Sequence, residues 1–159
     1  MPALLEDPCI VVSLEPARGV LRFTRTERPY TSLDEVVLLH QRIGRIFDRL
    51  GRDRHLLLVD MRRAPLNNRD DFEQAAARGR SILVRGFRRI SVLVQTAVGA
   101  LQVGRHLRED HVVGEVFTDE AQALEYLGRL ELERAPPSYV TTALENGPFN
   151  HLARLAGKK

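Results

Sequence analysis

Short apolar runs alternate along the chain with longer segments of helical periodicity. Residues 9–15 and 19–26 are rich in β-forming residues, and the Pro-Ala-Arg-Gly turn between them predicts an antiparallel hairpin. Continuous apolar runs at 55–61, 89–96 and 111–117 are typical of strands covered on both faces. The pattern therefore predicts about five strands, of which the first two form a hairpin.

A segment with helical spacing follows the second predicted strand and each of the three strands after it, which gives four predicted helices. Ser32 with Glu35 three residues later predicts a capping box at the start of the first helix. Asn67, Asn68 and Asp70 offer caps for the second helix. The third helix is expected to run through Val98, Leu101, Val103 and Leu107, and the Thr-Asp-Glu-Ala stretch at 118–121 is expected to cap the fourth.

This order, ββαβαβαβα, predicts an α/β fold with a mixed, mostly parallel sheet and four helices. The domain is expected to span residues 1–133, because Pro136 and Pro137 then stop the last helix. The tail, residues 134–159, has apolar positions near helical spacing at 149–155. We expect a short helix there that docks on its own domain or on a second copy in a homodimer.

Composition narrows the class of protein. Hydrophobic residues make up 43% and charged residues 28%, as in ordinary globular domains. No apolar run approaches the roughly 20 residues that cross a bilayer, and the acidic N-terminus does not resemble a secretory signal. A single cysteine, Cys9, agrees with a reducing compartment. These features predict a cytoplasmic protein without a membrane segment.

The formal net charge is +3, and all but two of the 24 basic residues are arginines. The arginines are interleaved with acidic residues, and the clusters at 62–63 and 85–89 have only Phe87 as a neighbouring aromatic. Nucleic-acid platforms combine cations with stacking rings. The pattern therefore favours solvated charged faces over nucleic-acid binding.

Three stretches resemble the STAS family, the fold of bacterial anti-sigma-factor antagonists, and in particular its STAS-like uncharacterised bacterial members. They are LLLVDMRRAP at 56–65, ISVLVQTAVGALQVGRHL at 90–107 and GEVFTDEAQALEYL at 114–127. The resemblance covers roughly residues 9–132 and implies a regulatory protein-interaction module. In family antagonists a serine at the start of the second helix is phosphorylated. The corresponding stretch here, residues 66–71, contains no serine or threonine, so that switch is missing.

Asp60 ends an inner strand, a position at which many α/β proteins carry catalytic groups. A phosphorylated aspartate would need further carboxylates for a metal and a nearby cation. Glu15 lies on the predicted hairpin, and the only lysines are the last two residues. We therefore expect Asp60 to accept hydrogen bonds from loop amides.

The residues required for hydrolytic catalysis or for a zinc site are also absent from the sequence. No G-x-S-x-G nucleophile elbow occurs, the five histidines are dispersed, and one cysteine is too few for a usual zinc site. The turn from Thr96 to Gly99 would suit an anion at a helix start, but small residues there also permit close packing. We expect no catalytic residue, metal or cofactor.

The sequence thus predicts a non-enzymatic interaction module that binds an acidic protein surface through arginines and helix-end amides. The predicted surface lies at one end of the sheet and comprises Asp60, Arg62, Arg63, Asn67, Asn68, Arg69, Asp70, Thr96 and Gly99. The alternative is a sensor that binds a small anionic ligand, a nucleotide or a lipid-like molecule, at the same edge.

Overall fold

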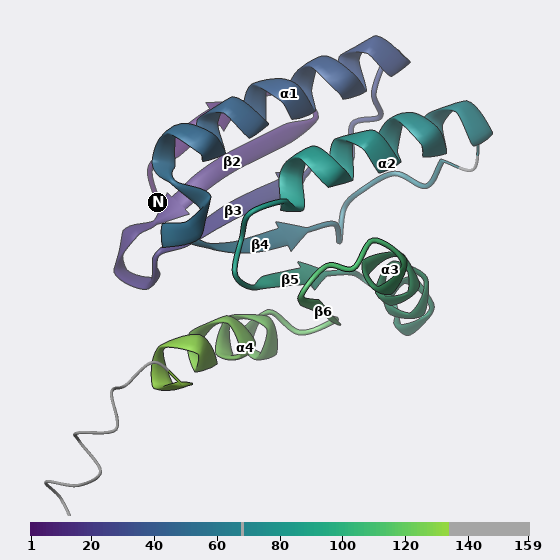
Figure 1. The fold of residues 1–159 in the computed structure, drawn as a ribbon. Coiled ribbons are helices and arrows are strands. Elements are labelled where there is room, and N and C mark those ends of the chain that lie inside the picture. Colours follow the sequence, from purple (N-terminus) through teal and green to yellow (C-terminus); the bar gives the residue numbers. More distant parts are fainter. Residues whose placement is uncertain (68, 134–159) are drawn as a thin grey trace, which may run out of the picture. The chain divides into compact units, whose positions relative to one another are not determined.

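The computed structural model describes residues 1–67 and 69–133. It is an α/β fold in which one sheet has the strand order β1-β2-β3-β4-β5-β6 (Figure 1). The strands are β1 (Ala3–Glu6), β2 (Ile10–Glu15), β3 (Val20–Arg25), β4 (Leu56–Asp60), β5 (Ile90–Leu93) and β6 (Gly114–Phe117). The helices are α1 (Leu33–Leu50), α2 (Asp70–Val84), α3 (Ala97–Glu109) and α4 (Glu120–Glu133). Residues Met1–Gly128 form one compact unit.

The predicted hairpin and the predicted parallel strands are confirmed. β2 and β3 pair antiparallel, with Ile10 opposite Arg25 and Glu15 opposite Val20. Gly19 closes their connection in the left-handed conformation, with φ of 61°, which glycine adopts without a steric penalty. From β3 to β6 each strand runs parallel to the next.

The prediction of about five strands missed β1. This strand pairs antiparallel with β2 and is interrupted by a register shift between Ala3 and Leu5. It has only four residues, which is too short for a clear alternating pattern. Leu5 is nevertheless buried, and this burial explains why the segment joins the sheet.

The helix starts agree with the sequence at α1 and differ at α2. Ser32 caps α1 by accepting a hydrogen bond from the Glu35 backbone N–H at 3.1 Å. At α2 the N-cap residue is Arg69, without a side-chain cap. Asn67 instead accepts from the Arg69 N–H at 3.1 Å. Asn68 lies outside the described residues. Thus Asn67 orders the loop rather than the first turn of the helix, and Asp70 is the first residue of α2.

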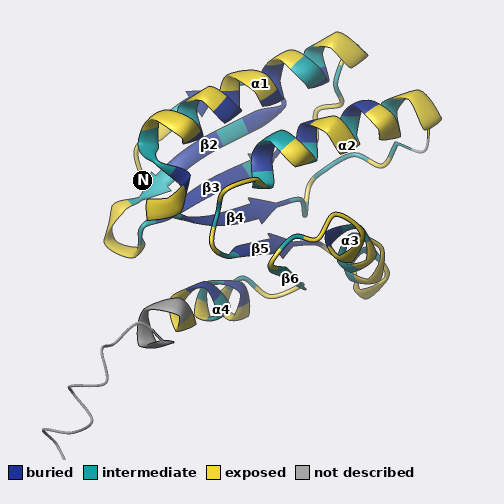
Figure 2. Cartoon of the chain, viewed as in Figure 1, coloured by how far each residue is buried: buried dark blue, intermediate teal, exposed yellow. Residues whose placement is uncertain are grey.

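The sheet separates two apolar layers, because successive strand residues point to opposite faces. One layer packs residues of α1, α2 and α3 against alternate strand positions: Leu39, Ile43, Phe47, Leu83, Leu107, Leu21, Phe23, Leu57, Val59, Ile90 and Val92. The intervening positions Val20, Leu58 and Leu93 are also buried, as are Ala123 and Leu127 of α4. α4 therefore covers the second face. Figure 2 shows the buried inner strands and the exposed outer sides of α1 and α2.

Glycines allow α1 and α2 to lie side by side (Figure 1). A Cβ at Gly79 would come within 2.8 Å of the His40 ring, and one at Gly44 within 2.7 Å of Ile82. Both distances are shorter than real Cβ contacts. The two helices are thus in contact through positions where a side chain would not fit, and this close packing fixes the spacing of their N-termini.

Candidate interaction site

The predicted surface residues lie where the parallel strands end and helices begin. β3, β4 and β5 lead into α1, α2 and α3, so the three helix starts share one end of the sheet. The ends of β4 and β5 are joined by a hydrogen bond of 2.8 Å from Met61 N–H to the Leu93 carbonyl. Thr96 caps α3 by accepting from the Gly99 N–H at 3.1 Å.

Asp60 is a buried strand-end carboxylate, with 6% of its surface exposed. Its Oδ1 accepts from the Arg62 backbone N–H at 3.1 Å and from Arg62 Nε at 2.9 Å. Its Oδ2 lies 2.6 Å from Arg62 Nη2 and 3.9 Å from Arg22 Nη1. Asp60 therefore accepts hydrogen bonds from the Arg62 backbone amide and guanidinium group, and it forms a longer ion pair with Arg22.

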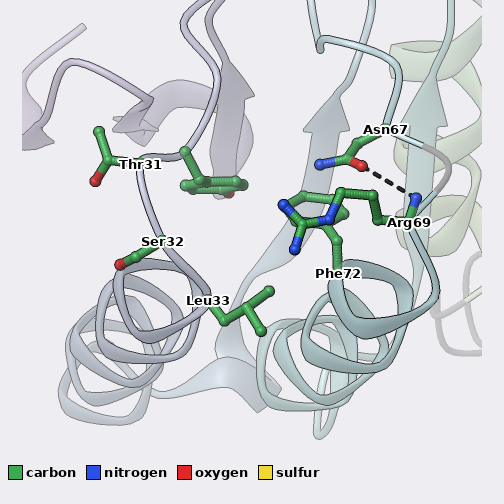
Figure 3. Close-up of a pocket in the computed structure, with 7 residues that line it drawn as sticks. Thr31, Ser32, Leu33, Asn67, Arg69 and Phe72 are labelled. Atoms are coloured by element: carbon green, nitrogen blue, oxygen red, sulfur yellow. Dashed lines mark hydrogen bonds between the residues drawn. The ribbon is translucent and has the colours of Figure 1, made fainter.

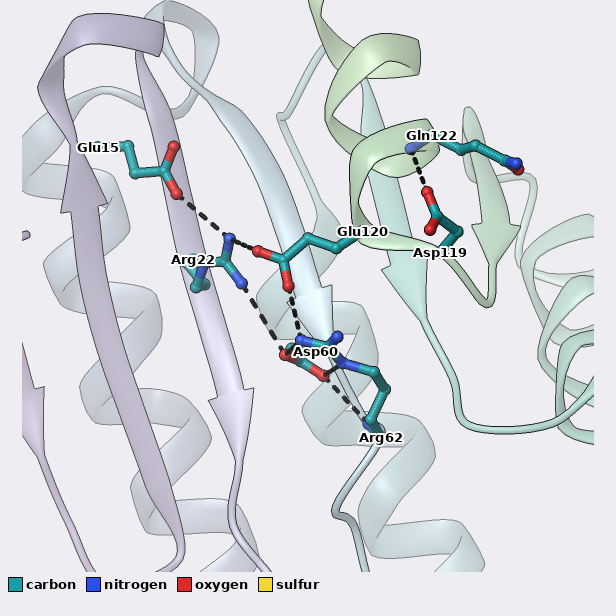
Figure 4. A network of polar contacts seen from close by, with 7 residues as sticks. All are labelled: Glu15, Arg22, Asp60, Arg62, Asp119, Glu120 and Gln122. Atoms are coloured by element: carbon teal, nitrogen blue, oxygen red, sulfur yellow. Dashed lines mark hydrogen bonds and ion pairs between the residues drawn. The ribbon is translucent and has the colours of Figure 1, made fainter.

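These side chains belong to a larger set of charges that we term the charge network: Glu15, Arg22, Asp60, Arg62 and Glu120 (Figure 4). Arg22 Nη2 lies 2.5 Å from Glu120 and 3.2 Å from Glu15. Arg62 Nη2 reaches the other oxygen of Glu120 at 2.8 Å. Glu120 is the first residue of α4, so the network joins this helix to β2, β3 and β4.

Both central carboxyl groups are held in the ionised form. Burial raises the pKa of Asp60, but the hydrogen bonds from Arg62 and the charge of Arg22 together bring it below its usual value. The hydrogen bond from Arg22 lowers the pKa of Glu120, against a smaller effect of burial. A general acid at neutral pH needs a raised pKa. This pair of carboxylates is therefore suited to binding cations and not to donating protons.

A pocket of about 250 Å³ lies between the starts of α1 and α2; we term it the α1–α2 pocket. Its lining residues are Tyr30, Thr31, Ser32, Leu33, Asn67, Arg69 and Phe72. In Figure 3, Thr31, Ser32 and Leu33 come from one side and Asn67, Arg69 and Phe72 from the other. The pocket thus combines apolar walls, hydroxyl groups and one guanidinium group.

Aromatic and cationic contacts hold Tyr30, one of the lining residues, in place. The guanidinium group of the buried Arg25 lies 4.0 Å from the Tyr30 ring centroid, a cation–π geometry. The Tyr30 ring is 5.9 Å from Phe72 and 6.2 Å from His40. Burial raises the pKa of Tyr30 to about 12, so its hydroxyl group stays protonated and neutral at physiological pH.

The exposed arginines of the predicted surface already have carboxylate partners within the chain. Arg63 pairs with Glu27, and Arg69 Nη2 lies 2.6 Å from Asp71. All four side chains are exposed to solvent. Solvent-exposed pairs are individually weak, so an external carboxylate can replace the internal one at little cost.

An exposed apolar side chain adjoins the pocket lining. Leu66 directly precedes Asn67 and exposes 94% of its surface, whereas neighbouring Pro65 is partly buried. Asp70 is exposed in the first turn of α2. Among the predicted residues the structure thus gathers Asn67 and Arg69 at the pocket, while Asp60 and Arg62 lie in the charge network and Thr96 and Gly99 form the start of α3.

The remaining nucleophilic and titratable groups have structural surroundings. Cys9 is buried, and burial raises the pKa of its thiol. His40 Nδ1 lies 2.6 Å from the Val36 carbonyl, and burial lowers the pKa of the imidazole. Within residues 1–67 and 69–133, no three His, Cys, Asp or Glu side chains are grouped to hold a metal ion. Over the same residues no helix has the length and apolar character to cross a membrane.

Sequence reasoning missed Arg22, Glu120 and the aromatic part of the pocket. Arg22 occupies an inner strand between apolar residues, and an arginine at such a position requires carboxylates on the same face of neighbouring elements. That requirement was the available signal for Glu120. Tyr30 and Phe72 had no comparable signal, because their proximity depends on how α1 and α2 pack.

No family model matches the chain, and neither the curated proteins nor the solved structures give a match. The resemblance to the STAS family therefore depends on the three sequence stretches and on the order of elements.

Proposed function

We propose that the chain is a non-enzymatic, STAS-like regulatory module that acts in the cytoplasm by binding an acidic surface of another protein. The observation that carries this proposal is the α1–α2 pocket, which combines a guanidinium group, helix-start hydroxyl groups and an apolar wall. The fully exposed Leu66 next to it supplies an apolar anchor. Interfaces commonly combine such an anchor with a polar rim.

Binding would use arginines that are held in place by weak internal pairs. A carboxylate of the partner would displace Asp71 from Arg69, and a second would displace Glu27 from Arg63. Because both internal pairs are exposed, the exchange costs little free energy. Leu66 would then be buried against an apolar residue of the partner, which contributes about 1.5–3 kcal/mol for a leucine side chain.

The charge network would support this surface without taking part in chemistry. Asp60 and Arg62 form three hydrogen bonds, and the one from the Arg62 backbone N–H, which an amide oxygen could also accept, holds the start of the loop that follows β4. The loop in turn carries Leu66, Asn67 and Arg69. The missing phosphorylatable serine means that, under this proposal, affinity is not controlled by the phosphorylation that family antagonists use.

Site-specific photocrosslinking tests the proposal. A photoreactive amino acid at position 66, in the full-length protein expressed in native cells, should capture one defined protein. The matched control position is Arg54, an exposed residue in the turn that precedes β4, which lies at the other end of that strand from the 61–69 loop. A Leu66→Asp change should abolish copurification of the captured protein. The proposal fails if positions 54 and 66 capture the same set of proteins.

The polar side chains that line the pocket also support a second function, the sensing of a small anionic ligand. Arg69 and the hydroxyl groups of Thr31 and Ser32 line a space close in size to small ligand sites. A thermal-shift screen with nucleotides and phosphorylated lipids distinguishes the two, because a ligand that binds the native state raises its melting temperature. For a ligand in this pocket, Arg69→Gln should remove the shift.

A further inference from the structure

A second hollow, of about 350 Å³, lies on a different part of the molecule, between the edge strand β1 and helix α1. We term it the edge groove. Leu4 of β1 and Ile46 and Leu50 of α1 supply its apolar surface, and Arg42, Arg45 and Arg49 line it as well. The apolar residues are half-buried and the arginines exposed. The groove thus has an apolar base with cations along one side.

No ion pair joins any of these three arginines to a carboxylate of the described residues, and they are the exposed arginines of this kind that lie together on one helix. Elsewhere on the same helix Asp48 pairs with the buried Arg52 at 2.6 Å and with Arg85 at 3.6 Å. With a rise of about 1.5 Å per residue, Arg42 and Arg49 lie about 10 Å apart along α1. They form a row of uncompensated positive charge parallel to the groove.

The groove is also bordered by unpaired backbone. β1 is the first strand in the sheet order and pairs only with β2 among the described residues. An edge strand presents backbone N–H and C=O groups that another chain can pair with. Backbone pairing, an apolar base and a row of cations therefore coincide along one edge of the sheet.

We propose that the edge groove binds an extended acidic segment of a different protein, which adds to the sheet beside β1. Side chains on one face of a strand recur about every 6.6–6.8 Å. Carboxylates at alternate positions of such a segment would match the row of arginines, and backbone pairing would supply affinity independent of sequence. This site is separate from the α1–α2 pocket and does not depend on the function proposed for it.

Charge excludes a second copy of the chain as the occupant. Antiparallel pairing of β1 with β1 of another copy would be a two-fold interface, in which each patch meets itself. Arg42, Arg45 and Arg49 of both copies would then face one another across the junction. Nucleic acid is a weaker candidate because the groove contains no aromatic side chain for base stacking.

Fluorescence anisotropy with a defined peptide tests the inference. The full-length protein is titrated into a labelled Glu-Val-Glu-Thr-Glu-Val-Glu peptide, with the same peptide N-methylated at every residue as a second ligand. The triple variant Arg42→Gln, Arg45→Gln and Arg49→Gln removes the row of charge. A matched variant, Arg78→Gln, Arg88→Gln and Arg108→Gln, removes the same number of exposed arginines from other elements.

The proposal predicts at least tenfold weaker peptide binding for the groove variant and less than a twofold change for the matched variant. The N-methylated peptide should also bind at least tenfold more weakly, because it cannot pair with the strand edge. If both triple variants bound the peptide equally weakly, the loss would be due to the protein's net charge and not to the groove, and the proposal would be overturned. So would tighter binding of labelled oligothymidine than of the peptide, or concentration-dependent dimers that the groove variant abolishes.

Discussion

Replacing Asp60 by Asn removes one charge from the centre of the charge network and keeps nearly the same shape. The amide oxygen can still accept from the Arg62 backbone N–H, which lies 3.1 Å from Oδ1 in the native protein. The substitution removes the negative charge of Oδ2, which lies 2.6 Å from Arg62 Nη2 and 3.9 Å from Arg22 Nη1. Arg22 is the critical group, because only 10% of its side chain is exposed.

The size of the effect follows from what remains. Removing one partner of a buried ion pair costs about 3–5 kcal/mol when the other charge is left unpaired. Here Arg22 keeps Glu15 and Glu120, and Arg62 keeps Glu120. We therefore expect Asp60→Asn to lower the free energy of unfolding by about 2–3 kcal/mol. Glu120→Gln should cost less, about 1 kcal/mol, because 36% of that side chain is exposed.

Urea denaturation followed by far-UV circular dichroism measures both variants, and pH supplies the decisive control. The folded-state pKa of Asp60 lies below its ordinary value of 3.8. Its stabilisation is therefore complete above about pH 5 and is lost as the pH falls through the folded-state pKa. The difference between wild type and Asp60→Asn should be constant above about pH 5 and shrink below it. A variant as stable as wild type at pH 7, or a difference independent of pH, would refute the reasoning.

Three further predictions concern packing, protonation and capping. Gly79→Ala should lower the free energy of unfolding by about 1–3 kcal/mol, because its Cβ would collide with the His40 ring. The control is Gly128→Ala, since nothing lies within 4 Å of a Cβ at that position. In the same denaturant titration this control should stabilise α4 by up to about 1 kcal/mol. Burial lowers the pKa of His40 from 6.5, so protonation favours the unfolded state. The midpoint of unfolding should fall as the pH drops below 6.5, and His40→Gln should remove this dependence. Thr96→Ala removes the cap of α3 and should cost about 1 kcal/mol; an unchanged urea midpoint would contradict that role.

Most of the helices and strands could be predicted from short stretches of neighbouring residues. The capping pair Ser32 and Glu35 and the continuous apolar run ending at Asp60 each depend on a few neighbouring residues, and the structure confirms them. β1 was not predicted, because its formation depends on pairing with β2 and not on a pattern in its own short sequence. The start of α2 differed because Asn67 bonds within the loop.

The site was less accessible to sequence reasoning because its contacts are long-range. The sequence placed Asp60 at a strand end, but Arg22 and Glu120, which are 98 residues apart in the chain, meet only when α4 packs across the second face of the sheet. The same holds for Tyr30 and Phe72, which depend on the close approach of α1 and α2 at Gly79. Exposed Arg63 and Arg69 could be identified from the sequence, whereas their internal partners could not.

Separating stability from binding tests the account most directly. The protein captured through position 66 is titrated against wild type, Leu66→Asp and Asp60→Asn by biolayer interferometry, at a temperature at which all three are folded. We predict that Leu66→Asp keeps the wild-type urea midpoint and loses binding, whereas Asp60→Asn loses stability and keeps an affinity within about threefold of wild type. Loss of binding in folded Asp60→Asn, with Leu66→Asp still binding, would contradict the account and make the buried carboxylate the functional group.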